Sequence, residues 1–289
     1  MEAEKEIQMT TVRRVSYVFL CIVPFLNFAV VGVRAFRVPG VYQMVGVAYF
    51  AAMAFAAWTL GARAIIASAE RERRLALAGM LLMVPSTLMA LLWVGLGPPW
   101  VATPVENRMR YLVLLIDSIA VTGGFVVLEQ ALHEAGERFY STLGTALAIL
   151  AGAAYLVWNC FFFGLYVVKA RGGQTPAAFV SLGDSIDALI FIACILTYFA
   201  TLIFAVCMGR IGWLGRGATR AYVIANLLLL LLIVIKGLSY PDPTATSAPW
   251  YLNLGFIAGI PAVPWIMPYL FGVVLLRCAG REPVATKAA

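Results

Sequence analysis

Residues 110–137 read RYLVLLIDSIAVTGGFVVLEQALHEAGE, and the interpretation of the whole chain begins with this stretch. The apolar run Tyr111–Leu132 is long enough to cross the hydrocarbon of a bilayer as a helix, which takes about 20 residues. It nevertheless contains Asp117 and Glu129. A charged side chain at the centre of a membrane costs about 2.5–3.5 kcal/mol on insertion scales, so a carboxylate in such a run points to function.

The rest of the chain has the composition of a membrane protein. Hydrophobic residues make up 63% of it and charged residues 12%, whereas globular domains are about 45–50% apolar and about 25% charged. The loops between the apolar runs are too short for a soluble domain. The sequence therefore predicts an all-α, polytopic integral membrane protein, a bundle of about eight transmembrane helices. The predicted spans are 15–33, 41–60, 75–96, 111–132, 143–168, 185–208, 221–238 and 251–276.

Lysine and arginine predict the orientation of the bundle. The two ends of the chain and the loops on their side of the membrane hold 14 of these residues, and the opposite loops hold 7. Because cytoplasmic loops are enriched in Lys and Arg, both termini are predicted to be cytoplasmic. Residues 1–14 then form a cytoplasmic segment without a cleavable signal pattern, 15–277 a single transmembrane domain, and 278–289 a cytoplasmic tail.

The net charge of +7 lies in these loops and does not indicate nucleic-acid binding. Arginine outnumbers lysine by 17 to 4, a bias typical of GC-rich bacterial genomes, so the expected location is a bacterial cytoplasmic (inner) membrane. The five cysteines fall within or at the ends of apolar runs and form no CxxC pair. They therefore predict no disulfide framework.

The strongest candidate site is a polar pocket in the outer half of the bundle. Asp117 lies about 10 Å into its span, and Asn159 and Trp158 lie in the next span among several aromatic residues. Lys236, near the outer end of its own span, is a candidate ion-pair partner or a residue that snorkels to the interface. We interpret this set as a binding site for a small or apolar molecule. The alternative is a structural Asp117 that is hydrogen-bonded to Asn159, Ser118 or a neighbouring backbone group.

Asp184 and Asp187 are placed at the start of the sixth predicted span. Ser181 and Asp184 have the spacing of a helix cap, and acidic residues in a first turn favour the positive end of the helix dipole. Both aspartates are therefore expected to stabilise the start of this helix. The alternative is that they form the mouth of the ligand site.

Three prolines, Pro261, Pro264 and Pro268, interrupt the last predicted span. Proline removes a backbone donor and kinks a helix, and a carbonyl freed inside a membrane needs another partner or a cavity. We predict a hinge or flexible wall here, with a merely bent helix as the alternative.

Glu129, His133 and Glu137 follow one another at four-residue spacing near the cytoplasmic end of the fourth span. This spacing places them on one helical face. Glu129 and His133 are therefore predicted to form a pH-sensitive contact. His133 is the only histidine, so neither a metal site nor a haem site is expected.

The sequence predicts no cofactor, and an enzyme is not favoured. The chain has no P-loop, no dinucleotide fingerprint, no HExxH and no GxSxG. Three functions remain: small-molecule transport or membrane sensing through the polar cavity, a structural or accessory subunit of a membrane complex, and a lipid-handling enzyme centred on Glu129 and His133. The expected partners are the lipid bilayer, an apolar or small-molecule ligand, and a membrane protein or a second copy of the chain. Nucleic acid is not an expected partner.

Overall fold

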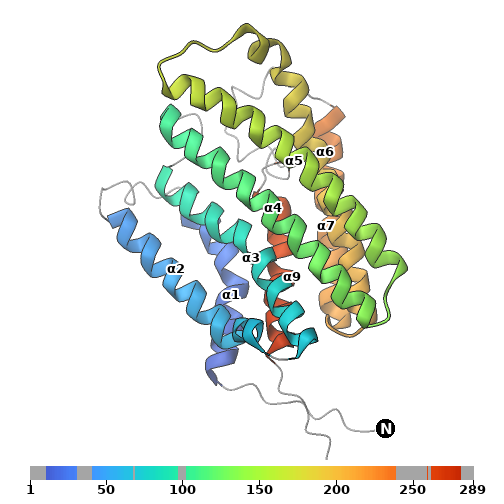
Figure 1. Cartoon of the computed structure of the whole chain (residues 1–289). Helices are drawn as coiled ribbons and strands as arrows, with labels where there is room; N and C mark the ends of the chain where they lie inside the picture. Colours follow the sequence, from blue (N-terminus) through green and yellow to red (C-terminus); the bar gives the residue numbers. More distant parts are fainter. Residues whose placement is uncertain are drawn as a thin grey trace, which may run out of the picture.

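The computed structural model describes residues 11–30, 41–67, 69–96, 102–238, 259 and 262–280. All regular structure in these residues is helical, and no strand occurs among them (Figure 1). The helices are α1 (Thr11–Val30), α2 (Val41–Leu60), the short 3-10 helix η2 (Ala62–Ile66), α3 (Glu70–Leu96), α4 (Pro104–Glu134), α5 (Phe139–Ala170), α6 (Ala177–Arg210), α7 (Arg216–Leu238) and α9 (Ala262–Ala279).

Four of these helices are long and apolar enough to cross a membrane. The stretches concerned are Pro104–Glu134, Phe139–Ala170, Ala188–Arg210 and Arg216–Ile235. The outward faces carry exposed large apolar side chains, such as Leu228 at 56% on α7. A long helix whose exposed face is apolar suits hydrocarbon better than water. The chain is therefore an all-helical protein with membrane-spanning helices.

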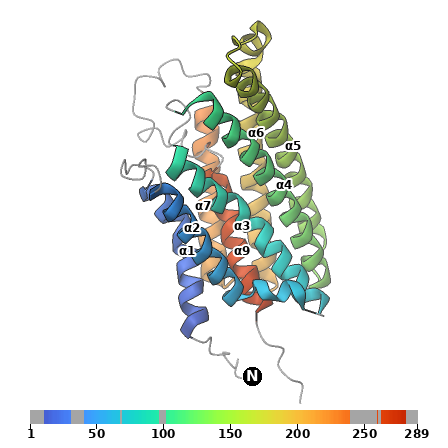
Figure 2. The same ribbon diagram turned by 60° about the vertical axis from the view of Figure 1, so that its left-hand side comes forward.

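Helix α9 lies in the middle of the bundle (Figures 1 and 2). Every residue from Phe271 to Leu276 is buried. It packs closely on α3 at two glycines: a Cβ added to Gly272 would lie 2.6 Å from the carbonyl oxygen of Gly79, and one added to Gly79 would lie 2.9 Å from that of Gly272. Small residues let membrane helices approach at backbone distance, and here they hold α9 against α3.

Helices α3 to α6 pack against one another in sequence order. Helix α4 packs on α3 and α5, and α5 packs on α6. Gly124 of α4 faces Leu82 of α3, and Gly152 of α5 faces Thr122 of α4. The glycines of α5 are thus divided between two neighbours, because Gly144 faces Phe204 of α6 instead. These glycines serve helix contacts within the chain.

The start of α4 lies seven residues before the predicted span. Thr103 caps it: the Glu106 amide donates to Thr103 Oγ1 at 3.3 Å, and the Thr103 amide donates to Glu106 Oε2 at 2.6 Å. Pro104 follows the cap at the first helical position, where its missing N–H is not needed. Residues 104–110, interpreted from sequence as a loop, are therefore helical.

From Val41 to Leu238 each predicted span lies within one described helix. The cap predicted at Ser181 is wrong, because α6 begins four residues earlier at Ala177 and the Ser181 hydroxyl donates to the Ala178 carbonyl inside the helix. Of the last predicted span, α9 covers the part from Ala262 onward, and residues 251–258 lie outside the described part.

We predict that Gly272→Ala destabilises the protein by about 1–3 kcal/mol, the usual range for overpacking a tight core. The added methyl group would meet the backbone of α3, which cannot rotate away. The matched control is Gly183→Ala in α6, where a Cβ meets nothing within 4 Å. Unfolding in mixed detergent micelles measures both variants, and equal stability of the two would contradict the close contact of α3 and α9.

Candidate functional site

Asp117 lies in the middle of α4 and is fully buried, with 0% exposure. Neither of its carboxylate oxygens has a hydrogen-bond partner in the described part of the chain. Most buried polar groups in proteins do have one, and an isolated buried charge is far costlier than a neutral group. An ionised Asp117 would therefore be costly here unless another group compensates its charge.

Asn159 joins α5 to α4 one residue away from Asp117. Its Nδ2 donates to Ser118 Oγ at 3.0 Å and to the Leu114 carbonyl at 3.2 Å, and Ser118 Oγ also donates to that carbonyl at 2.7 Å. These bonds fix the orientation of the Asn159 side-chain amide, because its NH₂ group must face two acceptors. The Asn159 Oδ1 atom is left buried without a described partner.

This geometry corrects one alternative from the sequence. Asp117 is not hydrogen-bonded to Asn159 or to Ser118, because Ser118 lies about 100° around the helix and takes the Asn159 amide instead. The pairing of Asp117 with Lys236 stays a prediction, since the Lys236 side chain lies outside the described part. The side chains of Asp184 and Asp187 also lie outside it, although their backbone belongs to the first third of α6.

Trp158 belongs to a group of rings between α4 and α5. Its ring meets Tyr111 edge-on at 5.4 Å between centroids and Phe162 at 5.1 Å. Tyr111 is stacked on Phe162 at 5.2 Å and on Tyr166 at 5.4 Å. The aromatic residues around Trp158 are therefore a set of mutually packed rings. Tyr155 of the same helix packs elsewhere.

Tyr155 and Trp265 meet in the interior with ring centroids 5.2 Å apart. The Tyr155 hydroxyl lies 3.4 Å from Cys194 Sγ of α6, and the Trp265 carbonyl accepts from Ser86 Oγ of α3 at 3.4 Å. The indole Nε1 of Trp265 is buried without a described partner. Tyr155 lies one turn before Asn159 on α5, so α5 carries both groups on one face.

Sequence reasoning missed a buried charge above Asp117. Arg110 is 2% exposed, and its Nη1 donates to Asn107 Oδ1 at 2.7 Å, with Asn107 equally buried. Arg110 lies seven residues, or about 10 Å, from Asp117 on the same face of α4. The sequence signal that Arg110 belongs to the helix is the Thr103–Glu106 capping box, which starts α4 about two turns before Arg110.

The predicted proline hinge lies at the start of α9. Pro264 is in the first helical turn, where a missing N–H breaks no helical bond, and Pro268 is inside the helix. Because Pro268 has no N–H, the Pro264 carbonyl receives no i+4 helical bond. Pro261 lies outside the described residues.

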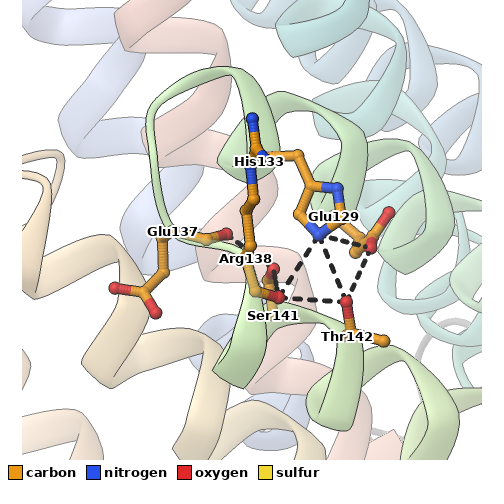
Figure 3. Close-up of polar contacts among 6 residues, drawn as sticks. All are labelled: Glu129, His133, Glu137, Arg138, Ser141 and Thr142. Atoms are coloured by element: carbon orange, nitrogen blue, oxygen red, sulfur yellow. Dashed lines mark hydrogen bonds and ion pairs between the residues drawn. The ribbon is translucent and has the colours of Figure 1, made fainter.

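Glu129 and His133 form the second polar group, at the far end of α4 (Figure 3). His133 Nε2 lies 3.0 Å from Glu129 Oε1 and 3.2 Å from Thr142 Oγ1 of α5. Thr142 Oγ1 lies 3.2 Å from Glu129 Oε1, and the Arg138 carbonyl lies 3.2 Å from the same histidine nitrogen. The predicted contact of Glu129 with His133 is present and ties the end of α4 to the start of α5.

Glu137 does not share this face, contrary to the sequence expectation. Helix α4 ends at Glu134, and Gly136, with a φ of +93°, turns the chain. The Glu137 carboxylate therefore points away from His133 (Figure 3) and lies 3.4 Å from Arg210 Nη1 of α6. Glu134 pairs with Arg74 of α3.

The second polar group is not arranged as a hydrolytic triad. In such a triad the base uses one ring nitrogen for the nucleophile and the other for the carboxylate. Here His133 Nε2 faces both Glu129 and Thr142. Among the described residues, no group of three or more His, Cys, Asp or Glu side chains is close enough to hold a metal ion.

Comparisons with protein-family models, with curated proteins and with solved structures found no match for this chain. Function must therefore be inferred from the two polar groups of α4.

We predict that Asn159→Leu lowers the free energy of unfolding by about 0.6–2 kcal/mol, the range measured for hydrogen bonds between membrane helices. The change removes both bonds from α5 to α4 and leaves Ser118 bonded to Leu114. The measurement is unfolding in mixed detergent micelles, with Cys160→Leu on exposed α5 surface as the control. A stability equal to that of the control would show that the amide does not join the helices.

Proposed function

We propose that this protein binds a proton or a small cation at Asp117 inside its bundle, as part of small-molecule transport or membrane sensing. The bundle has about eight spans with both termini in the cytoplasm, and it resides in a bacterial cytoplasmic membrane. The observation that carries the proposal is the carboxyl group of Asp117, which is fully buried with neither oxygen in a described hydrogen bond.

The contrast with three other buried polar side chains supports a functional Asp117. Asn159 and Ser118 bond across α4 and α5, and Asn226 of α7 accepts from Thr201 of α6 at 2.6 Å. A side chain kept only to hold helices together is expected to make such bonds. Asp117 makes none that the structure describes. Unsatisfied polar groups inside proteins concentrate at functional sites.

The chemistry of the neighbouring atoms favours a donor or a cation as ligand. Asp117 offers two acceptor oxygens, and Asn159 Oδ1 is a further acceptor without a described partner. A bound proton makes Asp117 neutral, and a bound cation compensates its charge. Pro268 leaves the Pro264 carbonyl of the central helix α9 without a helical bond, so α9 is the proposed hinge of the bundle.

We predict that Asp117→Asn abolishes proton binding inside the bundle. Infrared difference spectroscopy detects the carbonyl stretch of a protonated carboxyl group. That band is expected in the unmodified protein and in Glu72→Gln, which changes a carboxylate at the start of α3, and not in Asp117→Asn. In liposomes that contain a pH-sensitive dye, loss of proton flux in Asp117→Asn would indicate transport, and loss of the band without a flux change would indicate sensing. A band that persists in Asp117→Asn would contradict the proposal.

We also predict that Asp117→Val raises the free energy of unfolding by about 1–2 kcal/mol. The change removes a buried group without a described partner, and relief of such a group is stabilising. Unfolding in mixed detergent micelles measures the effect beside Asn159→Leu, for which the opposite sign is expected. If Asp117→Val is destabilising to the same degree as Asn159→Leu, Asp117 is a structural contact. That result would favour the alternative function, a structural or accessory subunit of a membrane complex.

A further inference from the structure

A groove between α2 and α3 lies apart from both polar groups of α4. It encloses about 220 Å³ and is lined almost entirely by apolar side chains. These are Phe50, Met53, Ala54 and Ala57 of α2, and Met80, Met83, Val84, Thr87 and Leu88 of α3. The two helices lie side by side at one edge of the bundle (Figures 1 and 2).

The groove has no unsatisfied polar group to offer a ligand. Its one polar side chain, Thr87, donates its hydroxyl to the Met83 carbonyl of its own helix at 2.9 Å. Phe50 and Met80 are partly exposed, so the groove opens onto the outer surface that faces the membrane. Methionine side chains are flexible and adapt to an occupant of irregular shape. The walls therefore suit a hydrocarbon chain.

Two arginines lie at the end of the groove where α2 ends and α3 begins. Arg73 is on the same face of α3 as Met80 and Thr87, because the three follow at seven-residue steps, and it lies about 10 Å beyond Met80. Arg63 belongs to η2, which follows α2 and packs against α3. Both are exposed, and neither forms an ion pair with a described residue.

The neighbouring charges do not cancel this pair. Glu70 and Glu134 are both bound to Arg74, and neither is paired with Arg63 or Arg73. Glu72 lies next to Arg73 in sequence but about 100° around the helix. A phosphate group is the natural counter-charge for two exposed guanidinium groups at a headgroup layer.

We propose that the groove holds an acyl chain of an anionic phospholipid whose phosphate binds Arg63 and Arg73. Lipid tails are as apolar as the groove, so filling it gives no preference among phospholipids. The preference must come from the headgroup, and each arginine near the surface is expected to contribute about five-fold. This site is independent of Asp117.

Native mass spectrometry tests the proposal on the full chain in a mild detergent, titrated with phosphatidylglycerol or phosphatidylcholine. We expect one phosphatidylglycerol to be retained per chain, about 25-fold more tightly than phosphatidylcholine. The double variant Arg63→Gln/Arg73→Gln is expected to lose that difference. Its matched control is Arg216→Gln/Arg220→Gln, which removes two exposed arginines from α7 and keeps the same net charge as the double variant.

Ala57→Trp fills the groove and leaves the arginines intact, so it should abolish retention of both lipids. The unfolding transition of Ala57→Trp shows whether that variant folds. If it does not, Ala54→Leu is the replacement, because it fills the groove with a smaller side chain. Retention of phosphatidylglycerol by the filled variant, or a preference for phosphatidylglycerol that persists in the double variant, would overturn the proposal. So would equal losses in the double variant and its control, because net charge alone would then explain the binding.

Discussion

The backbone contact between Gly79 of α3 and Gly272 of α9 is the constraint on which the rest of the bundle depends. It lets α9 lie at the centre, where its side chains from Phe271 to Leu276 are buried. Helix α3 in turn supports α4 through Leu82 and Gly124. The position of Asp117 follows from this chain of contacts, since α4 is held by α3 on one side and by α5 on the other.

The positions of the helices were predictable because hydrocarbon demands long apolar runs. The residues at which the helices begin and end were less predictable. Capping and charge extend helices past the apolar stretch, as the capping box at Thr103 does for α4, and this brought Arg110 inside the bundle. The central place of α9 was not predictable, because short small-residue spacings are common in every span and do not identify which helices meet.

The candidate site was predictable in part. A carboxylate within an apolar run indicated a buried Asp117, and its full burial agrees with that expectation. Its surroundings were not predictable, because rotation about the helix axis decides whether residue 117 or residue 118 faces Asn159. The histidine contact shows the same limit: the four-residue spacing correctly joined Glu129 to His133, but Glu137 lies past the end of the helix and turns to Arg210.

The separation of Arg110 from Asp117 decides what state the carboxyl group rests in. Seven residues rise about 10 Å along a helix, and at that separation, with an effective dielectric constant of about 20, two opposite unit charges attract by about 1.7 kcal/mol. That is less than the 2.5–3.5 kcal/mol that a charged aspartate costs at mid-membrane on insertion scales. An attraction of this size from Arg110 alone does not offset the cost of an ionised Asp117. On the function proposed above, a cation that binds at Asp117 displaces the proton. The proposed function thus couples ion binding to proton release through a single buried carboxyl group.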